Sequence, residues 1–223
     1  MLQLAICHLP TYFGEAPSRE LIEQQASLLP EEFRTRVLER KYLPSLLQSL
    51  GGMLLLRHLL GPEEFARLAP TIQHDKNGRP FLPGGELDFN ISHSDDWAVC
   101  VLERDVDSPR VGVDIQSMPH GRNIDKIAKR FFTENEYDYY SAHHDRPLAF
   151  LRVWTRKEAL VKWKSGKLAA HLSKVDALRA TSTEPIAYDE YVIGDSYMLT
   201  VCHRRNTAAP AQNDFLWMVS PEE

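Results

Sequence analysis

Two acidic side chains stand out because each lies in a segment that would hold it rigidly. Asp114 lies near the end of the apolar run 111–115, and Gln116 shares its side of a strand because strand side chains alternate. Glu158 and Lys162 are four residues apart in a helical pattern, so they share one helix face. Two carboxylates and an ammonium could bind Mg²⁺ and a phosphate oxygen. Two simpler interpretations stay open: a turn-capping Asp114 and a surface Glu158–Lys162 ion pair.

A serine and a histidine, Ser92 and His93, follow the apolar pattern of residues 88–91. A hydrolase is disfavoured because the sequence has no Gly-x-Ser-x-Gly motif around a nucleophile. A histidine at a strand end could instead hold a phosphate group. A zinc site is disfavoured too, since there is no His-Glu-x-x-His motif and no paired cysteines.

The overall composition narrows the function classes further. The 223 residues include 26 Lys and Arg against 31 Asp and Glu, a formal net charge of −5, whereas proteins that coat nucleic acid are basic. No apolar run approaches the ~20 residues of a membrane helix, and the N-terminus lacks the basic stretch of a signal peptide. Cys7, Cys100 and Cys202 lie among apolar neighbours, which predicts buried thiols in a cytoplasmic protein.

The elements that would position these residues follow from periodicity and end signals. Residues 2–7 predict a strand, and 18–29, 30–41 and 44–60 predict helices, with Ser18 as an N-cap. Gly51 and Gly52 inside the third helix cost about 1 kcal/mol each relative to alanine, so they indicate the close approach of another backbone or a ligand.

The second part of the chain begins with a change of period. Residues 88–92, 97–102 and 110–115 predict strands. Residues 123–132 and 148–164 predict helices, and Thr133 with Glu136 forms a capping box for a helix between them. Strands are again expected at 188–193, 197–203 and 215–219. Grouped helices and strands of this kind predict an α+β protein rather than a doubly wound α/β protein.

The motifs occur in an order that resembles a known family. In chain order they are Asn-Gly-Arg-Pro at 77–80, Phe-Asn-Ile-Ser-His-Ser at 89–94, Val-Gly-Val-Asp-Ile at 111–115, Phe-Phe-Thr-Glu-Asn-Glu at 131–136, and Trp-Thr-Arg-Lys-Glu-Ala at 154–159 followed by Lys162. With Ser49 and the Leu-Leu-Arg end of 50–57, they resemble the 4′-phosphopantetheinyl transferases of the surfactin-synthetase-activating (Sfp) type. Any one motif is weak, whereas the ordered set is specific.

The resemblance implies a fold and a reaction. The fold would be two pseudo-symmetric α+β subdomains, residues 1–109 and residues 110–223, with coenzyme A between them and the metal site in the second. The enzyme would move the 4′-phosphopantetheine arm of coenzyme A to a serine of an acyl or peptidyl carrier protein in a Mg²⁺-dependent reaction. Adenosine 3′,5′-bisphosphate would be released. Neither nucleic acid nor a membrane would be a partner.

The resemblance also implies roles for individual residues. Asp114, Glu158 and Gln116 would form the Mg²⁺ site, Glu158 would act as the base, directly or through water, and Lys162 would stabilise the leaving phosphate. The coenzyme would be bound by a second group: Arg79, Ser92, His93, Arg36, Arg40 and Ser49. For Arg36 and Arg40, a solvated basic helix face is the alternative. An acidic carrier would dock on basic residues, for which the candidates are Lys126, Lys129, Arg130, Lys164 and Lys167.

Two departures from the family pattern keep other functions open. Gln116 stands where the family commonly has Glu, and residues 165–168 read Ser-Gly-Lys-Leu where Gly-Lys-Gly-Leu is frequent. Gln116 therefore motivates a second hypothesis, a non-catalytic relative that binds coenzyme A or a carrier as a regulator. A Mg²⁺-dependent nuclease or phosphatase built on Asp114 and Glu158 is a third, disfavoured by the acidic balance and the lack of a third nearby acid.

Overall fold

The computed structural model describes residues 1–104, 107–108, 110–118, 123–166, 172–194, 196–205 and 216–218. The strands are β1 (Leu2–His8), β2 (Gln73–His74), β3 (Pro80–Phe81), β4 (Leu87–Ser94), β5 (Trp97–Arg104), β6 (Gly112–Ser117), β7 (Ile186–Ile193), β8 (Tyr197–Arg204) and β9 (Leu216–Met218). The helices are α1 (Leu9–Phe13), α2 (Arg19–Ala26), α3 (Glu31–Leu38), α4 (Leu43–Leu60), α5 (Pro62–Leu68), α6 (Ile124–Phe131), α7 (Glu134–Ala142), α8 (Arg146–Trp163) and α10 (Ala180–Thr183). Short 3-10 turns lie at Ala69–Thr71 and Leu172–Lys174. Helices and mostly antiparallel strands occur in separate groups, which confirms the predicted α+β class.

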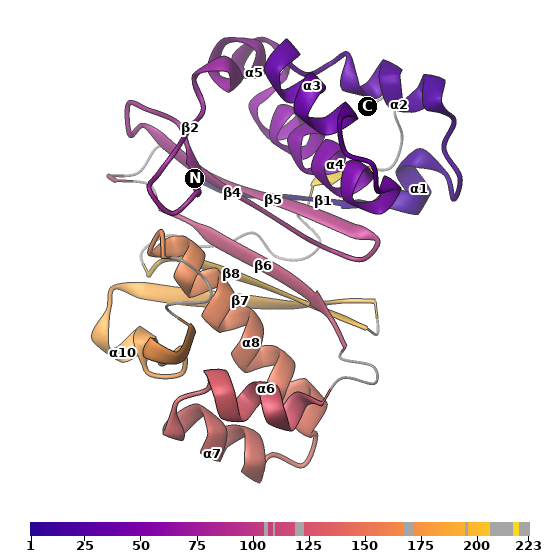
Figure 1. The fold of residues 1–223 in the computed structure, drawn as a ribbon. Coiled ribbons are helices and arrows are strands. Elements are labelled where there is room, and N and C mark those ends of the chain that lie inside the picture. The colour runs from indigo at the N-terminus through magenta and orange to yellow at the C-terminus, as the bar shows by residue number, and fades with distance from the viewer. Residues whose placement is uncertain are drawn as a thin grey trace.

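Two sheets pack against each other between two layers of helices (Figure 1). The first sheet has the order β4-β5-β1-β9, and α1 to α5 cover its outer side. The second has the order β6-β8-β7 and is covered by α8, with α6, α7 and α10 beside it. The longest helix of each layer is 18 residues long: α4 lies on the first sheet and α8 lies on the second.

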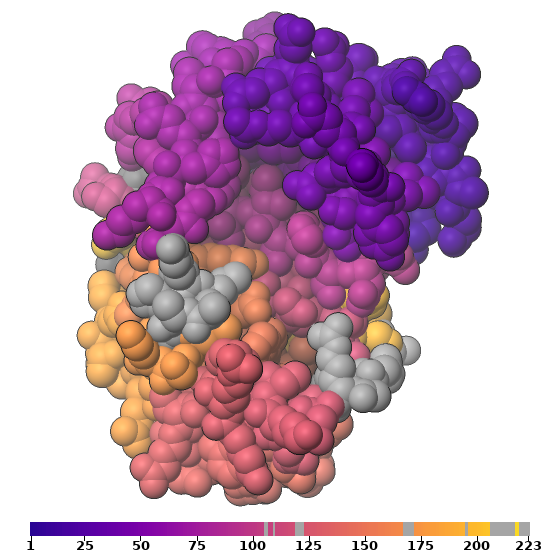
Figure 2. All heavy atoms as spheres, in the orientation of Figure 1, coloured from indigo at the N-terminus to yellow at the C-terminus, as the bar shows by residue number. Residues whose placement is uncertain are grey.

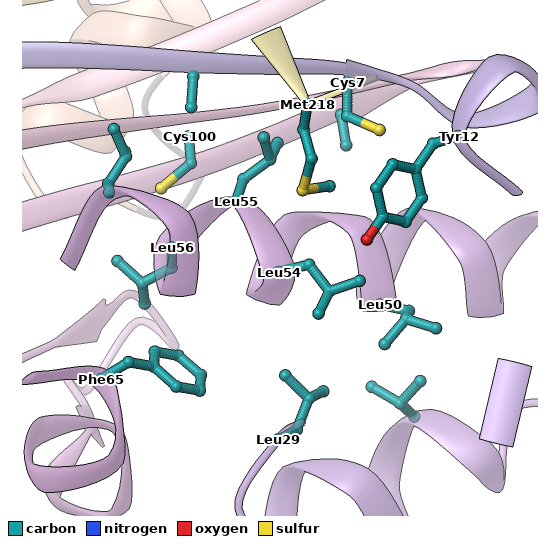
Figure 3. Packing of buried hydrophobic residues seen from close by; sticks show 14 of the residues in the cluster. Cys7, Tyr12, Leu29, Leu50, Leu54, Leu55, Leu56, Phe65, Cys100 and Met218 are labelled. Atoms are coloured by element: carbon teal, nitrogen blue, oxygen red, sulfur yellow. The ribbon is translucent and has the colours of Figure 1, made fainter. Parts of the chain in front are cut away.

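Both faces of the first sheet are buried, which explains the unbroken apolar runs of β1 and β5. Along β1, Leu4 and Ile6 pack between the two sheets, whereas Ala5 and Cys7 face the helices. Figure 3 shows Cys7 on the sheet and Leu55 of α4 in the helix-facing cluster. All three cysteines are free and buried, as predicted, and loss of water raises the pKa of the Cys7 thiol to about 12.

The paired glycines of α4 have a different purpose from the one predicted. A Cβ atom on Gly51 would lie 2.6 Å from Leu9 Cδ2, and one on Gly52 would lie 2.7 Å from Ile91 Cγ2. The neighbours are therefore side chains of α1 and β4, and the expectation of a backbone or a ligand at this point is wrong. The glycines let α4 settle on the first sheet at a spacing that a methyl group would prevent.

Two predicted helix starts agree with the structure, whereas the helices predicted to run to residues 29 and 41 end earlier, at Ala26 and Leu38. Ser18 caps α2 by accepting a hydrogen bond from the Leu21 N–H, and the capping box of Thr133 and Glu136 begins α7. Residues 215 and 219 of the predicted last strand lie outside the described residues, but Leu216–Met218 pairs in parallel with β1. A strand from the end of the chain thus completes the first sheet. The division into halves after residue 109, itself not described, stays a prediction.

Candidate active site

Side chains of β4 join the two sheets beside the site. Every second residue of β4 accepts a hydrogen bond from a backbone N–H of the segment that contains β6, always 23 positions later in the chain. The pairs are Asp88 with Val111 (2.9 Å), Asn90 with Val113 (3.0 Å), Ser92 with Ile115 (3.4 Å) and Ser94 with Ser117 (3.3 Å). We call these four side chains the β4 ladder. The ladder provides acceptors for the backbone N–H groups along one edge of β6, where no neighbouring strand does so. It thereby fixes where Asp114 lies.

A glycine brings α8 onto β6. A Cβ atom on Gly112 would lie 2.2 Å from the carbonyl oxygen of Ala159 and 2.7 Å from the backbone nitrogen of Trp163. Any side chain at position 112 would therefore push the helix away from the strand. This close contact places Glu158 and Lys162 of α8 over Asp114 of β6.

Asp114 and Lys162 form the centre of the site. The Asp114 side chain is 1% exposed, and its Oδ1 atom accepts hydrogen bonds from Lys162 Nζ (2.7 Å) and Ser92 Oγ (3.0 Å). Lys162 Nζ also donates to Ser92 Oγ and to the carbonyl oxygen of Val113, both at 2.9 Å. Such a network compensates the buried carboxylate. The predicted ion pair of Glu158 with Lys162 is thus largely replaced by a cross-element pair with Asp114.

Glu158 is the acidic residue of the site whose pKa is shifted most. Its carboxyl is largely removed from water and shares a hydrogen bond with Asp114, so its pKa is raised to about 8. Burial is the first cause and the Asp114 charge the second, while Lys162 and a hydrogen bond from Trp154 act in the opposite direction. The Trp154 indole is packed against Phe131 and Phe150, with ring centroids 5.7 and 5.8 Å away. These rings orient the indole toward Glu158.

The donor set fits Mg²⁺ better than a metal that needs many protein ligands. Among the residues that the structure describes, no group of three or more His, Cys, Asp or Glu side chains is arranged to hold a metal. Asp114 and Glu158 supply two touching carboxyls, and Gln116 Nε2 lies 3.2 Å from Asp114 Oδ2. Mg²⁺ is usually held by one or two carboxylates together with waters and substrate phosphates. A cation here would also relieve the like-charge contact that raises the Glu158 pKa.

Basic groups lie on the side of the site nearest α4. The pKa of His93 is lowered by loss of water and then by the positive charges of Lys162 and Arg40. Arg40 is held toward the start of α4 by a hydrogen bond to Ser45 Oγ (3.1 Å). Ser92, His93, Arg40 and Lys162 are thus brought together, and their binding to a coenzyme stays a prediction.

Two other predicted coenzyme ligands have less connection with this cluster. Arg36 is 58% exposed and pairs with Glu32 one turn earlier in α3 at 2.6 Å. No side-chain contact joins it to the site in the described part of the chain. Ser49 lies half-buried on α4. Their roles in coenzyme binding stay predictions.

Arg79 lies beside the site, but its guanidinium already donates hydrogen bonds to protein groups. It forms a two-pronged ion pair with Asp88 (2.9 and 2.6 Å) and donates to the carbonyl oxygens of Lys162 (3.0 Å) and Val111 (2.8 Å). Beside it is a cavity of about 230 Å³, lined by residues of the 77–80 turn, β4 and the end of α8. The predicted contact of Arg79 with coenzyme phosphates stays a prediction, and it would require one of these hydrogen bonds to break.

The β4 ladder and the Arg79–Asp88 pair were missed at the sequence level. The signal was present in the polar residues at every second position of Asp88–Ser94, in a strand whose Asp88, Asn90 and Ser92 are buried. That alternation is also typical of a strand with one solvent-facing side. Only the position of β6 beside β4 shows that the polar side faces protein.

A buried ion pair fixes the rest of α8. Lys157 and Glu136 are both 0% exposed, and Lys157 Nζ donates to Glu136 Oε2 and to the Val175 carbonyl oxygen at 2.5 Å each. Glu136 Oε1 accepts from the Ala177 N–H at 2.7 Å. Because Lys157 and Glu158 are consecutive and lie about 100° apart around the helix, this pair holds the face of α8 next to the one that carries Glu158.

Comparison with known proteins agrees with the geometry. The model of a family described as the 4′-phosphopantetheinyl transferase superfamily matches residues 110–215, which include Asp114, Glu158 and Lys162. The 4′-phosphopantetheinyl transferase psf-1 of Bacillus pumilus is 30% identical over 207 residues, which cover 86% of this chain and 86% of that protein. The chain belongs to the 4′-phosphopantetheinyl transferase superfamily. It is thereby an enzyme of the phosphopantetheinyl transferase class.

Other members of the superfamily align over a shorter part of the chain. A 4′-phosphopantetheinyl transferase of Bacillus subtilis is 35% identical over 138 residues, 56% of this chain and 59% of that protein. AcpT of Escherichia coli K12, also named a 4′-phosphopantetheinyl transferase, is 38% identical over 120 residues, 52% of this chain and 57% of that protein. No helix in the described part of the transferase combines the length and hydrophobicity needed to cross a membrane.

Proposed function

We propose that the enzyme transfers the 4′-phosphopantetheine arm of coenzyme A to a serine of an acyl or peptidyl carrier protein in a Mg²⁺-dependent reaction, with adenosine 3′,5′-bisphosphate as the second product. The observation that carries the proposal is the contact cluster of Asp114, Glu158 and Lys162, formed by two rigid elements in a chain of this superfamily. Carboxyls and an ammonium at one point are what the attack on a pyrophosphate requires.

Asp114 and Glu158 would hold the magnesium ion. When bound, Mg²⁺ supplies positive charge that polarises the pyrophosphate and offsets the charge built up during attack. Gln116 would contribute its amide carbonyl oxygen or orient a water, since its side chain reaches Asp114. As an amide removes one negative charge relative to Glu, it lowers the metal affinity but also reduces repulsion toward the pyrophosphate.

The protein groups account for the proton and the leaving group. The acceptor serine oxygen forms a bond to the β-phosphorus, and the bond from that phosphorus to the oxygen bridging to the α-phosphate breaks. Glu158 would accept the serine proton in its ionised form, directly or through a water. Lys162 would donate a hydrogen bond to the departing phosphate oxygens as their charge grows.

The coenzyme phosphates would be bound on the basic side of the site. His93, Arg40 and Ser92 lie beside Lys162, and Ser49 and Arg36 extend the predicted surface toward the N-terminal helices. Figure 2 shows the molecular surface set back between these helices and the layer of α6 and α7. Binding through several charges should weaken as salt is added. Titration calorimetry of coenzyme A at two salt concentrations, with Arg40→Ala beside the wild type, measures this.

The carrier would dock on α6. Lys126, Lys129 and Arg130 are exposed there, and Arg130 lies 5.1 Å from the ring centre of Phe131. Lys164 pairs instead with Glu184, and Lys167 lies outside the described residues. An exposed basic helix suits an acidic partner in a protein whose own net charge is −5.

A cytoplasmic location is part of the proposal. Three free, buried cysteines support a cytoplasmic location, where thiols stay reduced.

A mass measurement tests the proposed reaction. The enzyme is incubated with coenzyme A, Mg²⁺ and a panel of apo carrier proteins, and each carrier is weighed. A gain of the phosphopantetheine mass is expected with the wild type and is lost in Asp114→Ala and in Glu158→Ala, whose melting curves show that they are folded. Binding of coenzyme A without any gain in carrier mass would support the alternative function, a non-catalytic regulator that binds coenzyme A or a carrier. Transfer at the wild-type rate by either variant would overturn the assignment of the site.

A further inference from the structure

Every N–H group of the Arg79 side chain has an acceptor within the protein. Arginine carries five such donors. Nε donates to the Lys162 carbonyl oxygen (3.0 Å), and Nη1 donates to Pro80 O (3.2 Å) and Asp88 Oδ1 (2.9 Å). Nη2 donates to Asp88 Oδ2 (2.6 Å) and Val111 O (2.8 Å). The Arg79 and Asp88 side chains are only 6% and 7% exposed, so their charges are matched to each other inside the protein.

One of these acceptors belongs to a residue of the site. Lys162 lies in the last turn of α8, where backbone carbonyls have no partner within the helix. Arg79 adds a side-chain donor to the Lys162 carbonyl, which also accepts from the Ser165 N–H at 3.1 Å, and Arg110 donates to the next carbonyl, that of Trp163, at 2.6 Å. Two guanidinium groups therefore tie the end of the helix that carries Lys162 to the residues around it.

The other acceptors tie the same arginine to β6. Asp88 Oδ2 accepts from the Val111 N–H, and Arg79 donates to the Val111 carbonyl oxygen, so the pair holds both polar groups of that residue. Two residues later, the Val113 carbonyl accepts from Lys162 Nζ. Lys162 is thus held at both ends, with its backbone fixed by Arg79 and its ammonium on the strand that Arg79 also fixes.

We propose that Arg79, together with Asp88, is a positioning residue that sets Lys162 against Asp114, and that it is not a ligand of the coenzyme phosphates. The proposal rests on the transfer reaction proposed above. A small displacement of the last turn of α8 would move Lys162 Nζ away from the phosphate it stabilises, and errors of about 1 Å in such groups can cost up to 10²-fold in rate.

The positioning of Lys162 depends on the shape of the Arg79 guanidinium rather than on its charge. Only a planar fork can reach Asp88, Val111 and Lys162 from one position. Arg79→Lys keeps the charge and loses the fork. A phosphate ligand would tolerate this change much better than the loss of charge in Arg79→Ala, whereas a positioning residue would not.

A double-mutant cycle on kcat tests the proposal. The wild type, Arg79→Lys, Lys162→Ala and the double variant are assayed at saturating coenzyme A and carrier, well below each melting temperature. We expect Arg79→Lys to lose roughly 10-fold in kcat when Lys162 is present and less than two-fold when it is absent, because its effect passes through Lys162. The dissociation constant of coenzyme A, measured by calorimetry, should change less than two-fold in Arg79→Lys and in Arg79→Ala.

Two further variants keep the test decisive if Arg79→Ala does not fold. Asp88→Asn keeps an acceptor for Val111 but weakens the pairing with Arg79, and it should also lower kcat only when Lys162 is present. Arg104→Lys is the matched control, since Arg104 pairs with Glu64 at 3.0 Å in the N-terminal layer, away from α8. Its kcat should equal that of the wild type.

Three results would overturn the proposal. Equal losses of kcat with and without Lys162 would show a merely structural role. A coenzyme dissociation constant raised 10-fold in Arg79→Ala, with a reduced salt dependence, would show a phosphate ligand. An Arg79→Lys enzyme with wild-type kcat would show that the fork is dispensable. Failure of the transfer reaction itself is distinguished by the wild-type arm, which would then show no mass gain on any carrier.

Discussion

The contact between Asp114 and Glu158 predicts that the metal-free protein becomes less stable as the pH rises through neutrality. Glu158 has a pKa of about 8 in the folded protein against an ordinary value of 4.5. The folded state therefore holds this proton more tightly than the unfolded state does. Stability from this group is fully present below pH 4.5 and is lost as the pH approaches and passes 8.

The size of the effect follows from the two pKa values. Between pH 6 and pH 8 the proton linkage of Glu158 amounts to roughly 2 kcal/mol, because each pKa unit corresponds to about 1.4 kcal/mol and the curve flattens near pH 8. For a chain of this size, 1 kcal/mol shifts the melting temperature by roughly 2–4 °C. We therefore expect the melting temperature to fall by roughly 4–8 °C from pH 6 to pH 8.

Two variants separate Glu158 from other titrating groups. Melting curves are recorded in chelator-containing buffer at pH 6, 7 and 8. Glu158→Gln does not titrate, so its melting temperature should fall less than that of the wild type over this range. Asp114→Asn removes the neighbouring charge that contributes to the shift, and its fall should be intermediate. Mg²⁺ should stabilise the wild type more at pH 8 than at pH 6, since the ion competes with the proton.

An equal fall in melting temperature in the wild type and in Glu158→Gln would refute the raised pKa of Glu158. If the wild type and Glu158→Gln lose the same number of degrees between pH 6 and pH 8, Glu158 does not carry a raised pKa. If Mg²⁺ protects Glu158→Gln as well as it protects the wild type at pH 8, the carboxyl is not part of the metal site.

Three further predictions concern the surroundings of the site. Gln116→Ala should lose roughly 10-fold in kcat/KM, or about 1.4 kcal/mol, and Gln116→Glu should lower the Mg²⁺ concentration for half-maximal rate; metal titrations decide both. Reversing the charges of Lys129 and Arg130 to Glu should raise the KM for the carrier more than that for coenzyme A in steady-state assays. Lys157→Met leaves Glu136 buried without its cation and should cost about 3–5 kcal/mol in denaturant unfolding, part of which Glu136→Gln in the same chain should restore.

The site could be predicted from spacing because its chemistry lies on regular elements. Asp114 follows from the period of a strand, and Glu158 with Lys162 follows from the period of a helix. Their meeting depends on Gly112, whose missing side chain lets α8 contact β6. One sequence cannot show which helix a glycine admits. The resemblance to a family, and not the pattern alone, indicated that these two segments come together.

The hydrogen-bond partners of Arg79 could not be predicted from the sequence. A loop arginine beside glycine and proline is equally suited to an anion or to a protein carbonyl, and the choice depends on which groups lack a partner. In this protein the arginine's acceptors are the Lys162 carbonyl at the end of α8 and the Val111 carbonyl just before β6. Both are created by the tertiary arrangement, so no local pattern encodes them.

The arrangement of charges at the site is itself an argument for a ligand bound beside Asp114 and Glu158. Asp114 is compensated within the protein by Lys162, Ser92 and Gln116. Glu158, beside it, keeps its proton at neutral pH because protein groups do not fully compensate its charge. A fold selected only for stability would replace such an acid, since a buried like-charge contact is a cost. The cost is removed when a divalent cation arrives with an anionic substrate, and loss of activity without loss of stability in Glu158→Gln is the corresponding expectation.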